Sequence, residues 1–252
     1  MTANSNLRNA ICTEVSAALQ PRSEVLAGWE GGSAAFGALD AYSDIDLHFL
    51  VTDDAPLDGL YGAAEEALNK VSPITVSHNF PPGRYYKLKD SDEFPLIDLC
   101  FVRVGAADHF LDVDRHGNAR TLFDKAVWLS APVGKPDQAS ALKRRYADLK
   151  GWFPVSQGFV RKELLRGHHA AAMAAFWGYT VRPLADLLRM RYCAVRWDFG
   201  IRYLERDLPP AIYARFCNLL FVRDLADLEV RFVEGREWGV ALLAELASSD
   251  ET

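Results

Sequence analysis

Hydrophobic and polar positions follow two different patterns along the 252 residues of the chain. Up to about residue 104, short apolar runs of strand length alternate with helical stripes and turn residues, whereas from about residue 139 apolar residues recur at helical spacing throughout. The pattern predicts an α+β fold with a mixed sheet flanked by helices, followed by an all-helical C-terminal domain. We place the first domain at residues 1–130 and the second at 131–252.

The first domain is expected to contain three helices and five strands. The helices are predicted at 6–19, 34–39 and 57–71, and the strands at 24–29, 45–51, 74–80, 84–88 and 94–104. The turn Pro81-Pro82-Gly83 makes the third and fourth strands a hairpin. The stretch from Gly105 to Lys135 is rich in Gly, Asp and Pro and is predicted to be a connector.

The second domain is expected to consist of helices joined by short loops. They are predicted at 139–152, 157–167, 168–191, 211–219 and 225–246. Pro183 lies inside the third of these, and a proline lacks the backbone N–H that a helix interior requires. We therefore expect Pro183 to kink or split that helix.

Composition narrows the class of protein. Half of the residues are hydrophobic and a quarter are charged, which is typical of a globular protein with a sizeable core. We find no apolar run of about 18 residues and no leader pattern at the N-terminus, so neither a membrane span nor a signal peptide is predicted. The four cysteines are scattered without a CxxC pair, which indicates a reducing compartment and a cytoplasmic protein.

The net charge of −6 is unevenly distributed. Residues 1–130 carry a balance of −9, and residues 131–252 carry a balance of +3. This asymmetry is compatible with metal ions on one side of a ligand and anionic groups on the other. A pI of about 5.5 and the lack of a long basic run argue against nucleic acid as a partner.

One segment combines residues that suit phosphate and metal chemistry. The turn Gly31-Gly32-Ser33 is followed, ten residues later, by Asp44 and Asp46 at the start of a strand. Alternate side chains of a strand share a face, so the two carboxylates point the same way and repel each other unless a cation lies between them. Mg²⁺ is the expected cation, and the glycines allow backbone to approach a ligand closely.

A third carboxylate lies in a later strand that is otherwise apolar. Asp98 needs a partner or a metal there, and it joins Asp44 and Asp46 if the two strands are neighbours. The alternative is an ion pair with a cation of the hairpin, for which the candidates are Arg84, Lys87 and Lys89. His48 shares the face of Asp46 by alternation and is interpreted as a hydrogen-bonded, half-buried histidine.

Gly32-Ser33, Asp44-Ile45-Asp46 and Asp98 together resemble the nucleotidyltransferase superfamily of DNA polymerase beta type. The division into a short first domain and a helical second domain is most similar to bacterial antibiotic nucleotidyltransferases, such as aminoglycoside adenylyltransferases, and their relatives. The resemblance covers residues 24–104 and extends more loosely over 157–210, through the segments 162–167 and 198–204.

The resemblance implies a reaction and a role for each residue. A hydroxyl attacks the α-phosphate of a nucleoside triphosphate, ATP by default, and pyrophosphate leaves, with two Mg²⁺ ions as cofactors. Gly32 and Ser33 would then contact the nucleotide, and Asp44 and Asp46 would bind both metals. Asp98 would bind one metal and accept the proton of the attacking hydroxyl.

Two charged residues of the second domain have open roles. Lys162 is expected either to contact the triphosphate or to lie on a solvated helix face, and Arg166 is weighed in the same way. Glu163 competes with Asp98 for the role of general base, against a plain reading as a member of local ion pairs.

The sequence leaves the acceptor and the oligomeric state open. The first hypothesis is transfer to a hydroxyl of a small molecule, with aminoglycoside-like molecules as one candidate. The alternative is a regulatory or antitoxin-like nucleotide-binding protein that binds or modifies a partner protein, since a fold does not fix a function. Transfer to an RNA end is the weakest hypothesis because of the acidic pI.

Overall fold

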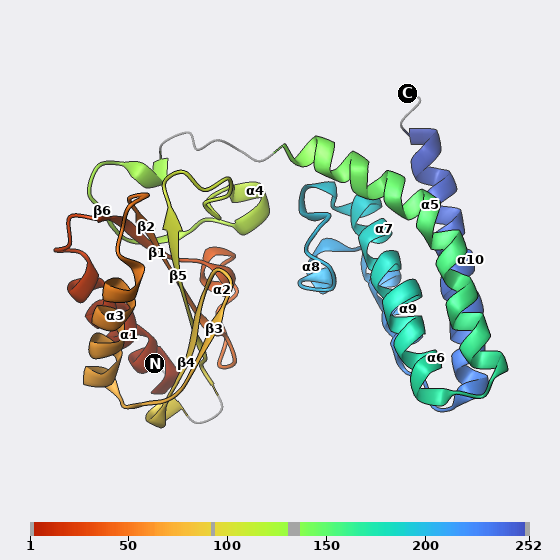
Figure 1. Cartoon of the computed structure of the whole chain (residues 1–252), viewed down its shortest axis with the longest axis horizontal. Helices are drawn as coiled ribbons and strands as arrows, with labels where there is room; N and C mark the ends of the chain where they lie inside the picture. Colours follow the sequence, from red (N-terminus) through yellow and green to blue (C-terminus); the bar gives the residue numbers. More distant parts are fainter. Residues whose placement is uncertain (1–2, 92–93, 131–136, 250–252) are drawn as a thin grey trace. The chain divides into compact units, whose positions relative to one another are not determined.

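The computed structural model describes residues 3–91, 94–130 and 137–249, and the chain forms two compact units, Met1–Pro136 and Asp137–Thr252 (Figure 1). The first unit contains a mixed sheet with helices, and every element between residues 137 and 249 is helical. This confirms the predicted α+β class. The predicted domain boundary, between residues 130 and 131, lies at the start of the segment 131–136, which is outside the described residues. No helix among the described residues is long and apolar enough to cross a membrane.

The sheet of the first unit has six strands in the order β3-β4-β5-β2-β1-β6. The strands are β1 Val25–Glu30, β2 Ile45–Val51, β3 Ile74–Phe80, β4 Gly83–Leu88, β5 Ile97–Arg103 and β6 Arg120–Asp124. Only β2 and β5 pair in parallel, and each other neighbouring pair is antiparallel. The predicted hairpin of β3 and β4 is therefore confirmed, and the parallel pair at the centre brings the two aspartate-bearing strands side by side.

The helices α1 (Ala3–Leu19) and α3 (Leu57–Val71) lie side by side against one face of the sheet (Figure 1). Ile45, Leu47 and Phe49 of β2 are fully buried on this face, as the alternation predicts. The intervening residues of β2 therefore point to the opposite face, which is the face that carries the polar positions of β2 and β5.

Two predictions for the first unit are wrong in part. The short helix α2 spans Gly32–Ala35, not 34–39, because the carbonyl of Ala35 is taken by the backbone N–H of Asn118 at 2.9 Å. The stretch predicted as a connector contains β6, which pairs with β1 at the sheet edge. Only Phe123 of β6 is buried, so its sequence lacks a strand's hydrophobic signal. The remaining short elements are α4 Val113–His116, η1 Lys89–Ser91 and η2 Trp128–Ser130.

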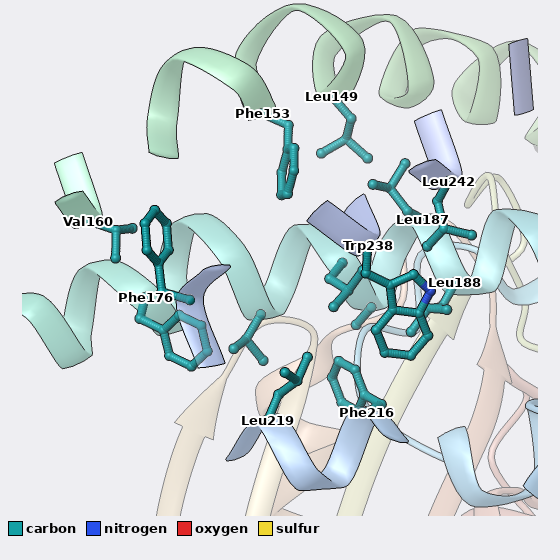
Figure 2. Close-up of a cluster of buried hydrophobic side chains, with 14 of the residues drawn as sticks. Leu149, Phe153, Val160, Phe176, Leu187, Leu188, Phe216, Leu219, Trp238 and Leu242 are labelled. Atoms are coloured by element: carbon teal, nitrogen blue, oxygen red, sulfur yellow. The ribbon is translucent and has the colours of Figure 1, made fainter. Parts of the chain in front are cut away.

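The second unit packs its helices around one apolar core, part of which Figure 2 shows with Phe153, Phe176 and Trp238. Its elements are α5 Gln138–Leu165, α6 His169–Phe176, η3 Trp177–Val181, α7 Arg182–Tyr192, η4 Ala194–Arg196, α8 Leu204–Asp207, α9 Pro210–Leu220 and α10 Leu225–Ser249. The helices predicted at 139–152 and 157–167 are one helix, α5, which continues through Pro154. Side chains on both sides of the proline enter the same core, and this packing outweighs the lost hydrogen bond.

The third predicted helix continues through Pro183 but changes its hydrogen-bonding pattern just before it. The chain forms the π-helical turn η3 between α6 and α7, and Pro183 is the second residue of α7. Because Pro183 has no N–H, it leaves the carbonyl of Tyr179 without its usual helical donor. Gln157 of α5 fills this role, since its Nε2 donates to that carbonyl at 2.8 Å, and Thr180 donates to Gln157 Oε1 at 2.8 Å.

Candidate functional site

Two of the three predicted carboxylates lie next to each other in the sheet. Asp46 of β2 and Asp98 of β5 are direct partners in the parallel register, and both are half-buried. Directly paired residues of neighbouring strands point to the same face, with backbones about 4.8 Å apart. The parallel pairing thus meets the condition that the sequence left open, namely that the strand of Asp98 lies beside the strand of Asp46.

The glycine turn packs against Asp46 at close range. Gly32 has a φ of +52°, and a Cβ at this position would lie 1.9 Å from Asp46 Oδ2. The N–H of Gly31 donates to the Asp46 carbonyl at 2.9 Å. Only glycine both adopts this φ easily and leaves room for the carboxylate. The glycine turn and the aspartates are therefore close in space because the chain after the turn folds back and places Asp46 of β2 against Gly31 and Gly32.

Asp44 lies at the same end of β2 but has a different environment. It is exposed, and its Oδ1 accepts a hydrogen bond at 3.1 Å from the backbone N–H of Leu96, just before β5. The described residues contain no group of three or more His, Cys, Asp or Glu side chains gathered to hold a metal ion. The structure thus pairs Asp46 with Asp98 and anchors Asp44 on the chain leading into β5.

This donor set fits Mg²⁺ bound together with a phosphate. Mg²⁺ prefers oxygen ligands, keeps several waters and is usually held by one or two carboxylates plus substrate phosphates, without an all-protein cage. Asp46 and Asp98 supply two carboxylates on one face of the sheet. In the glycine turn beside them, Gly31 is buried and its N–H is bonded to Asp46, whereas Gly32 is half-buried and has no side chain of its own that would cover Asp46.

Asp98 accepts a hydrogen bond from a residue of its own strand. The thiol of Cys100 donates to Asp98 Oδ1 at 3.4 Å. Burial, and then the charge of Asp98, raise the pKa of Cys100, so the thiol keeps its proton and stays a donor. Arg84, one of the cations weighed as a partner for Asp98, contacts Glu65 at 3.0 Å and Asp58 at 3.5 Å.

Ser33 lies within α2, directly after Gly32, and not before the helix as the sequence predicts. Its helix is only four residues long, so the helix dipole at this position is small. Ser33 is half-buried, and Gly31 occupies the N-cap position. The turn thus keeps Ser33 next to the glycine that contacts Asp46.

Lys162 and Glu163 lie near the end of α5, in the second unit. The Lys162 ammonium is 3.6 Å from Glu163 and 5.3 Å from the centre of the Phe159 ring. Glu163 also accepts from Arg166 at 3.1 Å and from His168 at 2.8 Å, and the His168 hydrogen bond holds the pKa of Glu163 below its usual range. A carboxylate held by a histidine hydrogen bond and by the charges of Arg166 and Lys162 is a weak base.

His48 shares the Asp46 face, as the alternation predicts. Its ring stacks on Trp29 with centroids 5.5 Å apart and lies 5.5 Å from Phe110. Burial lowers the pKa of His48 to about 4, so it is neutral at pH 7. The residue is half-buried and its ring has a hydrogen bond with the backbone of Asp46, as expected for the hydrogen-bonded, half-buried histidine that the sequence suggests.

Sequence reasoning missed two residues that frame the site, Arg8 and Glu30. Glu30 ends β1 directly before Gly31, is fully buried, and pairs with Arg8 of α1. The sequence contained a signal for it, since a lone acid at the end of an apolar strand needs a partner just as Asp98 does. No such signal pointed to Arg8, which lies on the predicted helix 6–19 without any motif around it.

The chain is structurally similar to nucleotidyltransferase-like proteins and aminoglycoside adenyltransferases, at low sequence identity. A nucleotidyltransferase-like protein from Exiguobacterium sibiricum is 13% identical, over 94% of this chain and 74% of that one, with a TM-score of 0.40. A spectinomycin adenyltransferase from Enterococcus faecialis, solved with ATP and spectinomycin, is 12% identical over 96% and 89%, with a TM-score of 0.41.

An aminoglycoside 6-adenyltransferase from Bacillus subtilis is 12% identical, over 92% of this chain and 90% of that one, with a TM-score of 0.34. No family model matches the sequence, and no curated protein matches it. The activities and ligands named for these proteins are properties of those proteins.

Proposed function

We propose that this chain is a Mg²⁺-dependent nucleotidyltransferase that moves a nucleoside monophosphate from a nucleoside triphosphate to a hydroxyl of a small acceptor. The observation that carries the proposal is the direct pairing of Asp46 with Asp98 on parallel strands, beside a glycine turn that contacts Asp46. ATP is the default donor, and an aminoglycoside-like molecule is one candidate acceptor.

Each part of the site has a role in this reaction. Mg²⁺ bound by the carboxylates would neutralise the charge that develops on the phosphates. The backbone at Gly32 would approach the triphosphate, with Ser33 as a further donor. Asp98 would accept the proton of the attacking hydroxyl, while the new bond to the α-phosphorus forms and the bond to pyrophosphate breaks. The Cys100 thiol fixes the orientation of Asp98 by its hydrogen bond.

Removal of one carboxylate tests the proposal. We expect Asp46→Asn or Asp44→Asn to lower the rate of pyrophosphate release at least about a hundredfold, because charge stabilisation at the transferring phosphate is lost. The measurement is pyrophosphate release from Mg²⁺ and each of four nucleoside triphosphates, over a panel of hydroxylated acceptors that includes aminoglycosides. Circular dichroism checks that each variant is folded.

The matched control is Asp54→Asn, which makes the same change just beyond the opposite end of β2, where the side chain is exposed. Asp54→Asn should keep full activity. Calorimetry with Mg²⁺ and ATP separates the enzyme from the regulatory alternative, which binds nucleotide without turnover. Full activity in Asp46→Asn would show that the carboxylate pair is not the reacting centre.

A further inference from the structure

A buried arginine of α1 connects two segments of the candidate site. The guanidinium of Arg8 donates through Nη1 to the carboxylate of Glu30, and through Nη2 to the carbonyl oxygens of Ser43 at 2.6 Å and Asp44 at 2.8 Å. The side chain of Arg8 is only 10% exposed. Hydrogen bonds from a charged donor in a desolvated place are among the stronger ones in proteins.

The acceptors of Arg8 flank the site on both sides. Glu30 directly precedes the glycine turn, and Ser43 and Asp44 directly precede β2. The turn is already joined to β2 by the bond from Gly31 N–H to the Asp46 carbonyl. Arg8 therefore closes a ring of contacts that sets the position of Asp44 relative to the glycine turn.

Groups outside the loop that ends at Asp44 hold it in place, and Arg8 is one of them. The Leu96 N–H also donates to Asp44 Oδ1, and the Phe94 ring packs edge-on against Tyr42. Residues 38–42 are exposed, and the hydrogen bonds around Asp40, Tyr42 and Ser43 lie within the loop itself. Arg8 ties the last two residues of the loop to the body of the first unit. Its loss would free the Ser43 and Asp44 carbonyls, and a shift of about 1 Å at such a residue costs about a hundredfold in rate.

A second arginine at Glu30 shows what a purely structural partner looks like here. Arg120 of β6 donates through Nε to Glu30 at 2.6 Å and through Nη2 to Cys12 Sγ at 3.3 Å. Its side chain is 44% exposed. Arg120 thus neutralises the same carboxylate from the sheet edge, while Arg8 alone of these two arginines also holds the carbonyls at 43 and 44.

We infer that Arg8 is a positioning residue of the site, which holds Asp44 at the distance from the glycine turn that a metal-bound triphosphate requires. The inference rests on the proposed function, because the proposed function supplies the metal-bound triphosphate that Asp44 and the glycine turn would both contact. Arg8 does not touch the reacting atoms, and its effect is transmitted through Glu30 and the backbone at Ser43 and Asp44.

The test is Arg8→Lys in the full chain, with Arg120→Lys as the matched control. A lysine keeps a positive charge near Glu30 but lacks the planar fork that reaches several acceptors. We expect Arg8→Lys to weaken the binding of Mg²⁺ with a non-hydrolysable ATP analogue about ten- to a hundredfold in calorimetry, the usual effect of losing a group that orients a metal ligand. Hydrogen–deuterium exchange of the free protein should be faster in peptides covering 37–46.

Arg120→Lys should leave binding within about twofold and exchange at 37–46 unchanged. If Arg8→Lys unfolds, the double variant Arg8→Gln with Glu30→Gln replaces the ion pair by a neutral pair of similar size, and it should show the same weakening. Pyrophosphate release then gives KM and kcat for the metal nucleotide. In Arg8→Lys, the rise in KM should be larger than the fall in kcat.

The two possible failures are distinguishable. Wild-type protein that binds no metal nucleotide and releases no pyrophosphate overturns the proposed function, and the inference with it. Wild-type protein that binds, with Arg8→Lys binding equally well, overturns the inference and leaves the proposed function standing. Equal weakening in Arg8→Lys and Arg120→Lys also overturns it, because neutralisation of Glu30 would then explain the effect.

Discussion

Each unit holds a buried carboxylate between two arginines. Glu30 in the first unit contacts Arg8 and Arg120, and Asp207 in the second contacts Arg189 and Arg196 at 2.5 Å each. The chemistry is the same, since each carboxylate is taken out of water and compensated by two guanidinium groups. What differs is the backbone that the remaining donors of each arginine hold.

In the second unit those donors hold the connection between α7 and α8. Arg189 is fully buried and donates through Nε to the Gly200 carbonyl at 2.7 Å, and through Nη2 to the Arg202 carbonyl. The cluster thus fixes a loop within its own neighbourhood. In the first unit Arg8 holds the residues that lead into the aspartate strand. A buried ion pair therefore indicates a functional site only when the backbone segments that it connects carry functional residues.

The largest expected effect concerns stability, and it favours the second cluster. Asp207→Asn leaves Arg189 buried without its counter-charge, and breaking such a pair costs about 3–5 kcal/mol of unfolding free energy. Glu30→Gln should cost less, because both of its arginines are more exposed than their counterparts, with Arg8 at 10% and Arg120 at 44% against Arg189 at 0% and Arg196 at 20%. Urea titrations followed by hydrogen exchange of peptides from each unit measure the two costs separately. A larger loss in Glu30→Gln would contradict the link between cost and arginine burial.

The next effect separates two glycines that lie beside the two clusters. Gly32 and Gly200 both have positive φ, at +52° and +57°, so alanine costs about 1–2 kcal/mol at either position. A Cβ at Gly32 also overlaps the Asp46 carboxylate, whereas at Gly200 it meets nothing within 4 Å. We expect Gly32→Ala to lose binding of Mg²⁺ with ATP and Gly200→Ala to retain it, as measured by calorimetry. Retained binding in Gly32→Ala would mean that Asp46 does not need its present position.

The same comparison shows how far the sequence reaches. Alternation placed Ile45, Leu47 and Phe49 in the core and Asp46 on the other face, because the strand is central and packed on one side by two helices. Local periodicity is sufficient there. It failed for β6, whose edge position buries only Phe123, and for α5, where packing on both sides of Pro154 keeps one helix continuous.

The site divides in the same way. The sequence could predict Gly32, Asp46 and Asp98 as neighbours because their segments follow one another in the order of a turn and two strands, although only the structure shows that β2 and β5 pair in parallel. Arg8 could not be predicted, since its contacts with Glu30 and Asp44 span long separations in the chain and depend on how α1 packs. Which side chains of neighbouring strands share a face can be predicted in part from local sequence. The contacts of a long side chain with residues far away in the sequence cannot.

The smallest expected effect is the pH dependence of the second cluster, which tests whether two arginines outweigh burial. Burial alone raises the pKa of Asp207, but the hydrogen bonds and charges of Arg196 and Arg189 outweigh it and hold the pKa below its ordinary value. Asp186 forms an ion pair with Arg145 at 2.7 Å, and it has a raised pKa because burial outweighs the Arg145 hydrogen bond and the charges of Arg145, Arg182 and Arg189.

These opposite shifts give opposite slopes of stability with pH. As the pH falls toward and below about 4, unfolded Asp207 takes up a proton before folded Asp207 does, so the stability that it contributes is lost. Folded Asp186 takes up its proton first, so its contribution becomes more favourable over the same fall. We expect the difference in unfolding free energy between wild type and Asp207→Asn to shrink from pH 6 to pH 3, and the Asp186→Asn difference to change in the opposite direction. If the two differences in unfolding free energy changed with pH in the same direction, the pair of arginines at Asp207 would not determine how this buried carboxylate is stabilised. The comparison of Asp207 with Glu30, which is also held by two arginines, would then lose its basis.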